Sequence, residues 1–336
     1  MKMTSKERVQ ASLKFSSPDR PPRDLWVLPY NSLFRKREVD AILAQYPPDF
    51  DRPELSPGLD DLDLQKLSRP GKYTDEWGSI WHLAEPGVVG EVKVPVLADW
   101  EKLWTFRPPW EHIRSRKWDH VNRVCERSDR FMISGVCARL FERLQFLRGS
   151  ENLYIDLGYG TSEVQRLIDM VHEYYLEDVG HWAATQVDGV MLMDDWGSNS
   201  SLLISPTVWR SVFKPLYKAY CDIIHASGKY VFFHSDGNIE SIYADLVEVG
   251  VDALNSQLFC MNIEELGRRF KGKLTIWGEI DRQQILPFGT REEIQNAVQR
   301  VRRAFDDGRG GVIAQCEWGK DNSRESIEAV FEAWNS

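Results

Sequence analysis

The sequence predicts an α/β protein built as a single (β/α)8 barrel of the TIM type. From about residue 130 onward, short apolar runs rich in Val, Ile and Phe alternate with segments of helical periodicity. Both faces of the strand candidates are apolar, which is typical of a parallel sheet covered on both sides. Six or more such units within about 200 residues fit a closed barrel better than an open sheet.

The apolar runs give six strand candidates, and a seventh is expected at Asp24–Leu28, while the eighth cannot be located from the pattern. The six are Phe131–Cys137, Gly189–Asp194, Tyr230–His234, Ala253–Gln257, Leu274–Glu279 and Gly311–Cys316. Helices are expected between them at Glu163–Thr185, Pro206–Ser227, Ile239–Val249, Ile263–Phe270, Arg291–Phe305 and Arg324–Trp334. Helix-start signals support two of these: Ser205 precedes a proline, and Thr290 precedes Glu293 with the spacing of a capping box.

Residues 40–125 differ from the rest of the chain. They are rich in Pro, Trp and charge and have no clear period, although residues 88–97 alternate enough to form a strand or hairpin. We interpret this segment as an insertion that covers one end of the barrel. Residues 1–336 then form one domain.

Composition excludes several classes of function. The chain has 42 Lys and Arg against 51 Asp and Glu, a formal charge of −9, which argues against a nucleic-acid partner. No apolar run approaches the roughly 20 residues that a transmembrane helix needs, so no membrane association is expected. Five scattered cysteines without a CxxC pair indicate reduced thiols and a cytoplasmic protein. The oligomeric state, monomer or homodimer, is left open.

Polar side chains follow the strand candidates, and the carboxyl ends of barrel strands meet on one face. These side chains are Asp194, Asp195, His234, Asp236, Asn255, Gln257, Glu279 and Cys316. Such a convergence of carboxylates, imidazole and thiol predicts an enzyme site at that rim. One aspartate of the pair 194–195 is expected to cap the turn that follows it.

Three of these side chains suggest a metal site. His234, Glu279 and Cys316 offer imidazole, carboxylate and thiolate, all normal zinc ligands, and three protein ligands leave the open position of a catalytic zinc. Asp236 would be a fourth ligand or would orient His234. A site without metal, with Asp and Glu as acid and base, stays open as an alternative.

The order of motifs resembles the uroporphyrinogen decarboxylase superfamily from end to end, most strongly from Asp188 onward. The resemblance is carried by Ser5-Lys6-Glu7-Arg8-Val9, Ser17-Pro18-Asp19-Arg20-Pro21, Phe233-His234-Ser235-Asp236-Gly237-Asn238, Ile280-Asp281, Leu286-Pro287-Phe288-Gly289-Thr290 and the last strand with Cys316. It implies a distorted (β/α)8 barrel, in agreement with the pattern.

Two branches of this superfamily differ in their motifs. True uroporphyrinogen decarboxylases carry an Arg-Gln-Ala-Gly-Arg motif whose arginines bind substrate carboxylates, and the stretch Arg23–Tyr30 lacks it. Cobalamin-linked methyltransferases hold zinc through His-x-Cys and a cysteine near the C-terminus. This chain is similar to them at His234 and Cys316 but has Asp236 in place of the first cysteine, so Glu279 would replace the missing thiolate.

The resemblance therefore implies a zinc-dependent enzyme that moves a methyl group from a small methoxylated compound, aromatic or aliphatic, to a separate corrinoid (cobalamin) protein. His234, Glu279 and Cys316 would bind the zinc. Asp194, Asp236 and Gln257 would orient substrate or ligands, and the expected substrate contacts are Trp196, Trp277, Trp318, Asp195 and Asn255. A metal-free decarboxylase of a tetrapyrrole or another carboxylated substrate is the alternative activity, and a barrel that binds a partner without catalysis is the non-enzymatic one.

Overall fold

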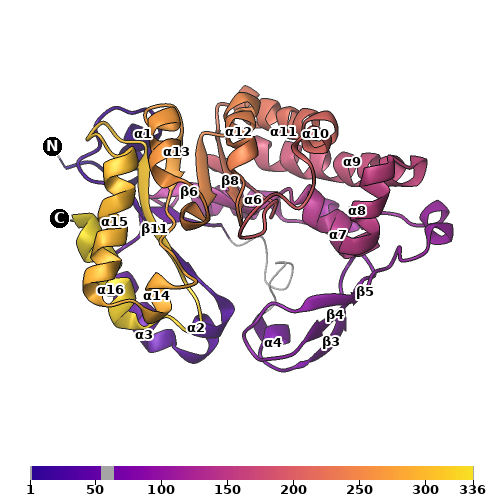
Figure 1. Ribbon diagram of the computed structural model, residues 1–336, viewed down its shortest axis with the longest axis horizontal. Coiled ribbons are helices and arrows are strands. Elements are labelled where there is room, and N and C mark those ends of the chain that lie inside the picture. The colour runs from indigo at the N-terminus through magenta and orange to yellow at the C-terminus, as the bar shows by residue number, and fades with distance from the viewer. Residues whose placement is uncertain (1, 54–63, 336) are drawn as a thin grey trace.

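Eight parallel strands form the main sheet of the computed structural model, which describes residues 2–53 and 64–335. Neighbouring strands pair in the order β1 (Arg23–Val27), β11 (Val312–Trp318), β10 (Thr275–Trp277), β9 (Ala253–Ser256), β8 (Tyr230–Ser235), β7 (Gly189–Met193), β6 (Phe131–Val136) and β2 (Phe50–Asp51). At the seam between β1 and β2, the amide of Asp49 donates to the carbonyl of Arg23 at 2.8 Å. The sheet is nearly closed, and the predicted barrel is confirmed (Figure 1).

Helices cover the outside of the barrel and connect its strands. Those of the N-terminal part are α1 (Ser5–Leu13), α2 (Pro29–Phe34), α3 (Lys36–Gln45), α4 (Leu64–Leu67), α5 (Trp110–Arg114) and α6 (Trp118–Cys125). Those that follow β6 are α7 (Leu140–Arg148), α8 (Ser150–Tyr159), α9 (Ser162–Ala184), α10 (Pro206–Val208), α11 (Lys214–Ala226), α12 (Tyr243–Val249), α13 (Ile263–Phe270), α14 (Ile285–Phe288), α15 (Arg291–Phe305) and α16 (Arg324–Asn335).

All seven predicted strands are present, with ends displaced by at most two residues. The eighth, β2, is only two residues long and pairs with Phe131 and Met132 of β6. A strand of two residues has no alternating pattern, which explains why the sequence did not locate it. Because β2 lies inside the segment 40–125, part of the predicted insertion belongs to the barrel itself, and residues 54–63 of that segment lie outside the described residues.

The predicted helix at Pro206–Ser227 is interrupted. It consists of α10, a π-helical turn at Trp209–Phe213, and α11. Pro215 lies in the first turn of α11 and has no N–H to donate, so the regular ladder cannot continue through it. The two predicted helix starts are confirmed, since Ser205 accepts from the amide of Val208 and Thr290 forms a complete capping box with Glu293.

Side chains on the barrel strands alternate between two hydrophobic clusters. On β11, Ile313 points into the barrel and packs with Trp277 and Phe232. Its neighbours Val312 and Ala314 point outward into the larger cluster between strands and helices. This period of two decides which residues further along each strand reach the interior and which face the helices.

Helix α1 closes the N-terminal end of the barrel. Its residues Val9 and Leu13 are buried in the interior cluster. The hydroxyl of Ser12 donates to the carbonyl of Val312 at 2.8 Å, and the carbonyl of Ser12 accepts from the amide of Gly311 at 2.9 Å. At the opposite, C-terminal end the side chains of Asp195 and Asp236 are partly exposed, so the interior is accessible there.

A three-stranded antiparallel sheet lies beside that C-terminal end (Figure 1). It consists of β3 (Gly71–Thr74), β4 (Ile80–Leu83) and β5 (Glu91–Val94), so the predicted strand within 88–97 is present. Lys320, just after β11, pairs with Glu85 at 2.7 Å, and Arg143 of α7 pairs with Asp75 at 3.3 Å. The small sheet is thus joined to the barrel rim on two sides.

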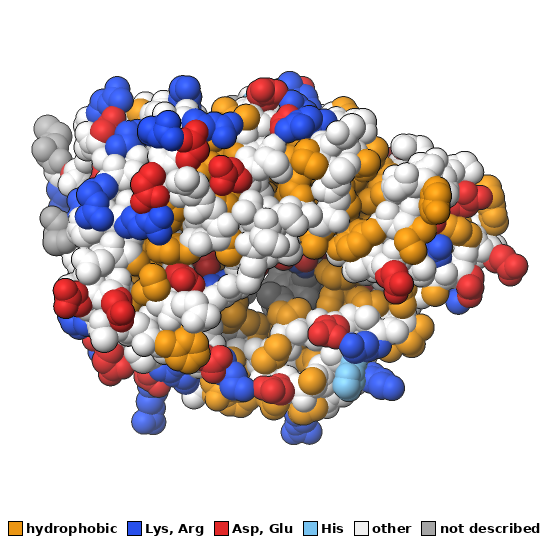
Figure 2. Space-filling view, viewed as in Figure 1, with side chains coloured by type: hydrophobic (Ala, Val, Ile, Leu, Met, Phe, Trp, Pro, Cys, Tyr) orange, Lys and Arg blue, Asp and Glu red, His pale blue; other side chains and the backbone are white. Residues whose placement is uncertain are grey.

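The surface is hollowed between the barrel and this small sheet, with hydrophobic side chains along the walls of the hollow (Figure 2). Among the described residues, no helix is both long enough and apolar enough to cross a lipid bilayer.

Candidate metal centre

The loops that follow β7 and β8 touch through two glycines. The amide of Gly197 donates to the carbonyl of Asp236 at 3.1 Å. A Cβ atom at Gly237 would lie 2.2 Å from the carbonyl carbon of Gly197, and one at Gly197 would lie 2.6 Å from the amide nitrogen of Asn238. Only glycine permits this approach of two backbones. This contact brings together the side chains of Asp195, in the loop after β7, and Asp236, in the loop after β8.

His234, Asp195 and Asp236 form a cluster of potential metal ligands. The Nε2 atom of His234 lies 3.5 Å from Oδ1 of Asp195 and 3.4 Å from Oδ1 of Asp236. One ligand atom from each residue lies within 4.8 Å of the other two, and the described part of the chain contains no second group of this kind. Three of the residues predicted at the rim are therefore together.

The chemistry of this cluster fits a divalent cation. Imidazole nitrogen and carboxylate oxygen are normal zinc donors. Oδ1 of Asp236 is buried and has no hydrogen-bond partner, and a buried acceptor of this kind is costly unless something binds it. Burial raises the pKa of Asp195 to about 6, and the nearby charges of Glu142 and Asp236 add to the effect. A bound cation would relieve each of these penalties.

Asn255 lies directly behind His234. The two residues are neighbours in register on β9 and β8, and Nδ1 of His234 is 2.6 Å from Oδ1 of Asn255. The amide nitrogen of Asn255 donates to the carbonyl of Trp277 at 2.5 Å. Asn255 is fully enclosed by these contacts, so its placement favours support of His234 over the expected contact with substrate.

Arg282 connects the cluster to two further carboxylates. It pairs with Asp236, with Glu317 at 2.7 Å and with Glu279 at 3.3 Å. Burial alone would lower the pKa of Arg282, but the three acidic neighbours outweigh that effect and raise it, so the guanidinium stays charged. Burial also raises the pKa of Glu279 well above its ordinary value. Glu279, predicted as a metal ligand, lies instead against Arg282 and outside the ligand cluster.

Cys316 is also outside the cluster. It occupies an outward position on β11, in step with Val312 and Ala314, and is buried in the hydrophobic layer beneath the helices. Burial raises the pKa of its thiol, which disfavours the thiolate that zinc requires. The inward positions at this end of β11 belong to Gln315 and Glu317, which contact Asn255 and Arg282. The structure therefore does not unite His234, Glu279 and Cys316 as a ligand set.

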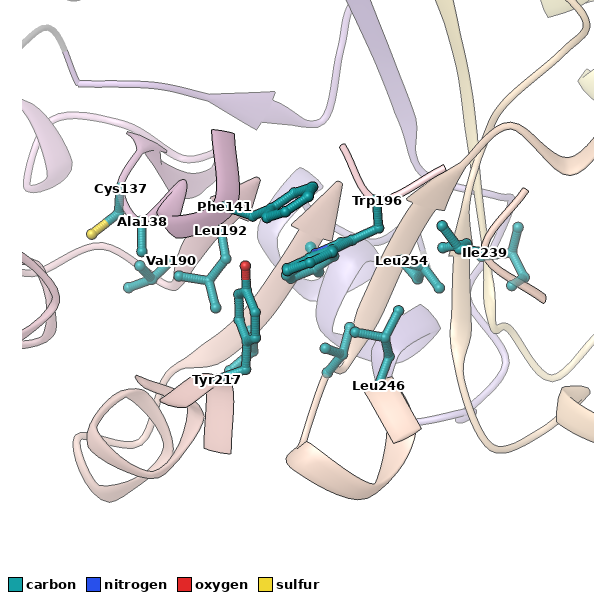
Figure 3. Packing of buried hydrophobic residues seen from close by; sticks show 14 of the residues in the cluster. Cys137, Ala138, Phe141, Val190, Leu192, Trp196, Tyr217, Ile239, Leu246 and Leu254 are labelled. Atoms are coloured by element: carbon teal, nitrogen blue, oxygen red, sulfur yellow. The ribbon is translucent and has the colours of Figure 1, made fainter. Parts of the chain in front are cut away.

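The three tryptophans expected to contact substrate are fully buried. Trp196 stacks on Phe141, with ring centroids 4.1 Å apart, among aliphatic side chains of the outer cluster (Figure 3). Trp277 belongs to the interior cluster, and the indole of Trp318 donates to the carbonyl of Asn322. All three are packing residues, because indoles without exposed surface offer nothing to a ligand.

An aromatic residue that the sequence did not single out lies closer to the centre. Trp26 of β1 is half-buried, and its ring centroid is 5.0 Å from that of His234. Its indole N–H donates to Asp24 at 3.0 Å, which fixes the ring on the barrel interior. The predicted strand at 24–28 already contained the signal, since Asp24 and Trp26 alternate with Leu25.

Asp194 and Gln257, expected to orient substrate, serve the scaffold instead. The carboxylate of Asp194 accepts from the amides of Phe141 and Glu142 at 2.8 and 2.7 Å, and also from the hydroxyl of Tyr217. It therefore caps α7, which precedes it in the chain, and not the turn that follows it as the sequence predicted. Gln257 accepts from the amide of Gly237 at 2.9 Å and borders a small cavity of about 20 Å³.

Comparison with known proteins agrees with this architecture. No curated protein matches the chain. A methyltransferase from Methanosarcina mazei has a similar structure, with a TM-score of 0.72, 14% sequence identity, and 99% and 98% of the two chains covered. A glycosylated endo-beta-1,4-xylanase from Gloeophyllum trabeum aligns with a TM-score of only 0.49 at 9% identity, over 97% and 99% of the chains. The family model for uroporphyrinogen decarboxylase (URO-D) matches residues 121–336. This match spans more than half of the sequence, and the chain belongs to the uroporphyrinogen decarboxylase family.

Proposed function

We propose that this protein is a zinc-dependent methyltransferase that moves a methyl group from a small methoxylated compound to a corrinoid carried by a separate protein. The observation that supports the proposal most directly is the cluster of His234, Asp195 and Asp236 at the open end of the barrel. The likeness to the methyltransferase from Methanosarcina mazei supports the fold on which such a reaction would take place.

The three clustered side chains would hold the zinc in place of the predicted set with Glu279 and Cys316. The bound metal would supply Lewis acidity toward the oxygen from which the methyl group departs. Two carboxylates and one imidazole form a harder ligand set than thiolates, and hard ligands suit an oxygen leaving group better than sulfur. Transfer would break the bond from methyl carbon to oxygen, whose electron pair leaves with the oxygen as alkoxide or phenolate, while Co(I) of the acceptor would supply the pair for the new bond and become Co(III).

Other residues of the chain would position the reactants. Arg282 binds Oδ2 of Asp236. The other oxygen of Asp236, Oδ1, has no hydrogen-bond partner and faces Nε2 of His234. The indole of Trp26 lies beside the His234 ring, with ring centroids 5.0 Å apart, and it would pack against a flat or methyl-bearing substrate. Asp24 keeps that indole in place.

The alternative, decarboxylation of a tetrapyrrole with many carboxylates, is disfavoured by the charges at the centre. Asp195, Asp236 and Glu317 are gathered there, and Arg282 is already paired with three carboxylates. A polyanionic substrate would meet repulsion at this site unless the cluster held a cation.

The proposal is tested by incubating the zinc-loaded protein with free cob(I)alamin and a panel of methoxylated aromatic and aliphatic compounds. The expected result is methylcobalamin, measured by its absorbance, with at least one member of the panel, and its loss in His234→Ala. Uroporphyrinogen serves as a parallel substrate. Its conversion to coproporphyrinogen by protein without zinc, with no methylcobalamin from any donor, would overturn the proposal.

A further inference from the structure

We propose that Asn255 is a positioning residue that fixes the tautomer of His234, with the proton on Nδ1 and the lone pair of Nε2 facing Asp195 and Asp236. This inference rests on the metal centre proposed above and names the residue that prepares its imidazole ligand. It assigns to Asn255 an indirect role, exerted through His234, in place of a contact with substrate.

The orientation of the Asn255 amide follows from its neighbours. Its nitrogen lies 2.5 Å from the carbonyl oxygen of Trp277, which can only accept a hydrogen bond. The Nδ2 atom must therefore face Trp277, and the Oδ1 atom must face the other way, toward His234. The same nitrogen also donates to Oε1 of Gln315 at 3.1 Å, so both of its hydrogens are used.

The tautomer of His234 follows from that orientation. Oδ1 of Asn255 can only accept, and it lies 2.6 Å from Nδ1 of His234, so Nδ1 carries the proton. A neutral imidazole protonated at Nδ1 has its lone pair on Nε2. That atom lies 3.4 and 3.5 Å from the carboxylates of Asp236 and Asp195, in the only described cluster of three potential ligands. The imidazole is thus prepared to bind a metal without rearrangement.

The barrel itself holds this arrangement. His234 and Asn255 are paired in register on adjacent strands, and both are almost completely buried. Gln315 reaches Asn255 across β10 because residue 278 has no side chain, since a Cβ atom at Gly278 would lie 2.0 Å from Oε1 of Gln315. Partners of this kind, which bind the second nitrogen of a histidine ligand, set its orientation, and their loss weakens metal binding about 10- to 100-fold.

The tautomer is measured directly by ¹⁵N NMR of the metal-free protein with labelled histidine, at a pH at which free imidazole is neutral. The chain has seven histidines, so the signal of His234 is assigned from its absence in His234→Gln. The expected result is a protonated Nδ1 and an unprotonated Nε2. A proton on Nε2 in the unmodified protein would overturn the proposal without any further variant.

Asn255→Leu removes the acceptor at nearly constant volume. It is expected to lose the preference for the Nδ1 tautomer and to bind zinc about 10- to 100-fold more weakly in a competition assay with a chelator. Asn255→Asp keeps the acceptor oxygen and is expected to retain the tautomer. Unchanged zinc affinity and an unchanged tautomer in the leucine variant would refute the role.

Asn31→Leu is the matched control. Asn31 is equally buried, and its amide nitrogen donates to the carbonyls of Trp318 and Gly319, but it has no contact with His234. It is expected to lower stability while leaving the tautomer and zinc affinity unchanged, and an equal loss of zinc in this variant would contradict the proposal. A failure of methyl transfer leaves these measurements intact, because neither of them involves substrate or corrinoid.

Discussion

The carboxylates of Asp194 and Asp195 point to opposite sides of the barrel wall. Asp194 faces outward and accepts hydrogen bonds from the first turn of α7 and from Tyr217. Asp195 faces inward, where its Oδ1 lies 3.5 Å from Nε2 of His234. Two identical and consecutive side chains thus belong to the scaffold and to the candidate site, because alternation along a strand continues past its last residue.

We expect substitution of Asp194 to affect mainly the stability of the protein and substitution of Asp195 to affect mainly its zinc affinity. Asp194→Asn places an amide against the two backbone N–H groups of α7 and should lower the free energy of unfolding by about 1–3 kcal/mol. Its zinc affinity per folded molecule should stay unchanged. Asp195→Asn should retain most of the stability and bind zinc about 100-fold more weakly or worse, since the loss of a ligand costs more than that of its supporting partner.

Urea unfolding and zinc competition measure these two quantities on the same preparations. Equal zinc affinity in both variants would exclude Asp195 from the metal centre.

Cys316→Ala distinguishes the ligand set seen in the structure from the set expected from the sequence. The thiol is buried in the outer hydrophobic layer, so the variant should bind one zinc with unchanged affinity and lose only about 1 kcal/mol of stability. His234→Ala, measured beside it, should lose zinc. Metal analysis of the two purified variants decides the matter, and loss of zinc from Cys316→Ala would reinstate the cysteine as a ligand.

Most of the barrel could be predicted because its strands are long enough to show a pattern. The apolar runs and helix-start signals from residue 131 onward correspond to strands and helices in the structure. Strand β2 could not be predicted, because a strand of two residues shows no pattern of its own. Its place between β6 and β1 depends on contacts with residues distant in sequence, such as the hydrogen bond from the amide of Asp49 to the carbonyl of Arg23.

The site was harder to predict than the fold. The rim location of His234, Asp195 and Asp236 follows from strand order, but strand order does not tell which rim side chains bind a metal and which, such as Asn255, only support the ligands. Both faces of a barrel strand are apolar, so hydrophobicity alone cannot tell that Cys316 points outward and Glu317 inward. The glycines after the two aspartates were the available signal that these loops approach each other.

Gly237→Ala should weaken the metal centre through the backbone. The added Cβ would lie 2.2 Å from Gly197, and φ at this position is +77°. Zinc affinity should therefore fall together with stability, by about 10-fold and about 1–3 kcal/mol. Gly228→Ala is the control, because its φ is +72° but a Cβ there meets nothing within 4 Å. Gly228→Ala should lower only the stability, through the strained backbone, and leave zinc affinity unchanged. A similar fall in zinc affinity in both variants would contradict the role of the loop contact.

The N-terminal motif around Arg8 and Asp19 should give the protein a defined acid sensitivity. Hydrogen bonds from Arg8 lower the pKa of Asp19 from 3.8 to about 2. The folded protein therefore holds this proton less tightly than the unfolded chain, so the contribution is complete above about pH 5 and is lost as the pH falls toward 2. The carboxylate is partly exposed, and solvent screening limits the contribution to about 1 kcal/mol. Asp19→Asn should lose it, so the difference in unfolding free energy between the two proteins, measured in urea, should shrink steadily from pH 5 to about pH 2.5. A difference that stays constant over this range would show that pairing with Arg8 does not lower the pKa of Asp19 in the folded protein.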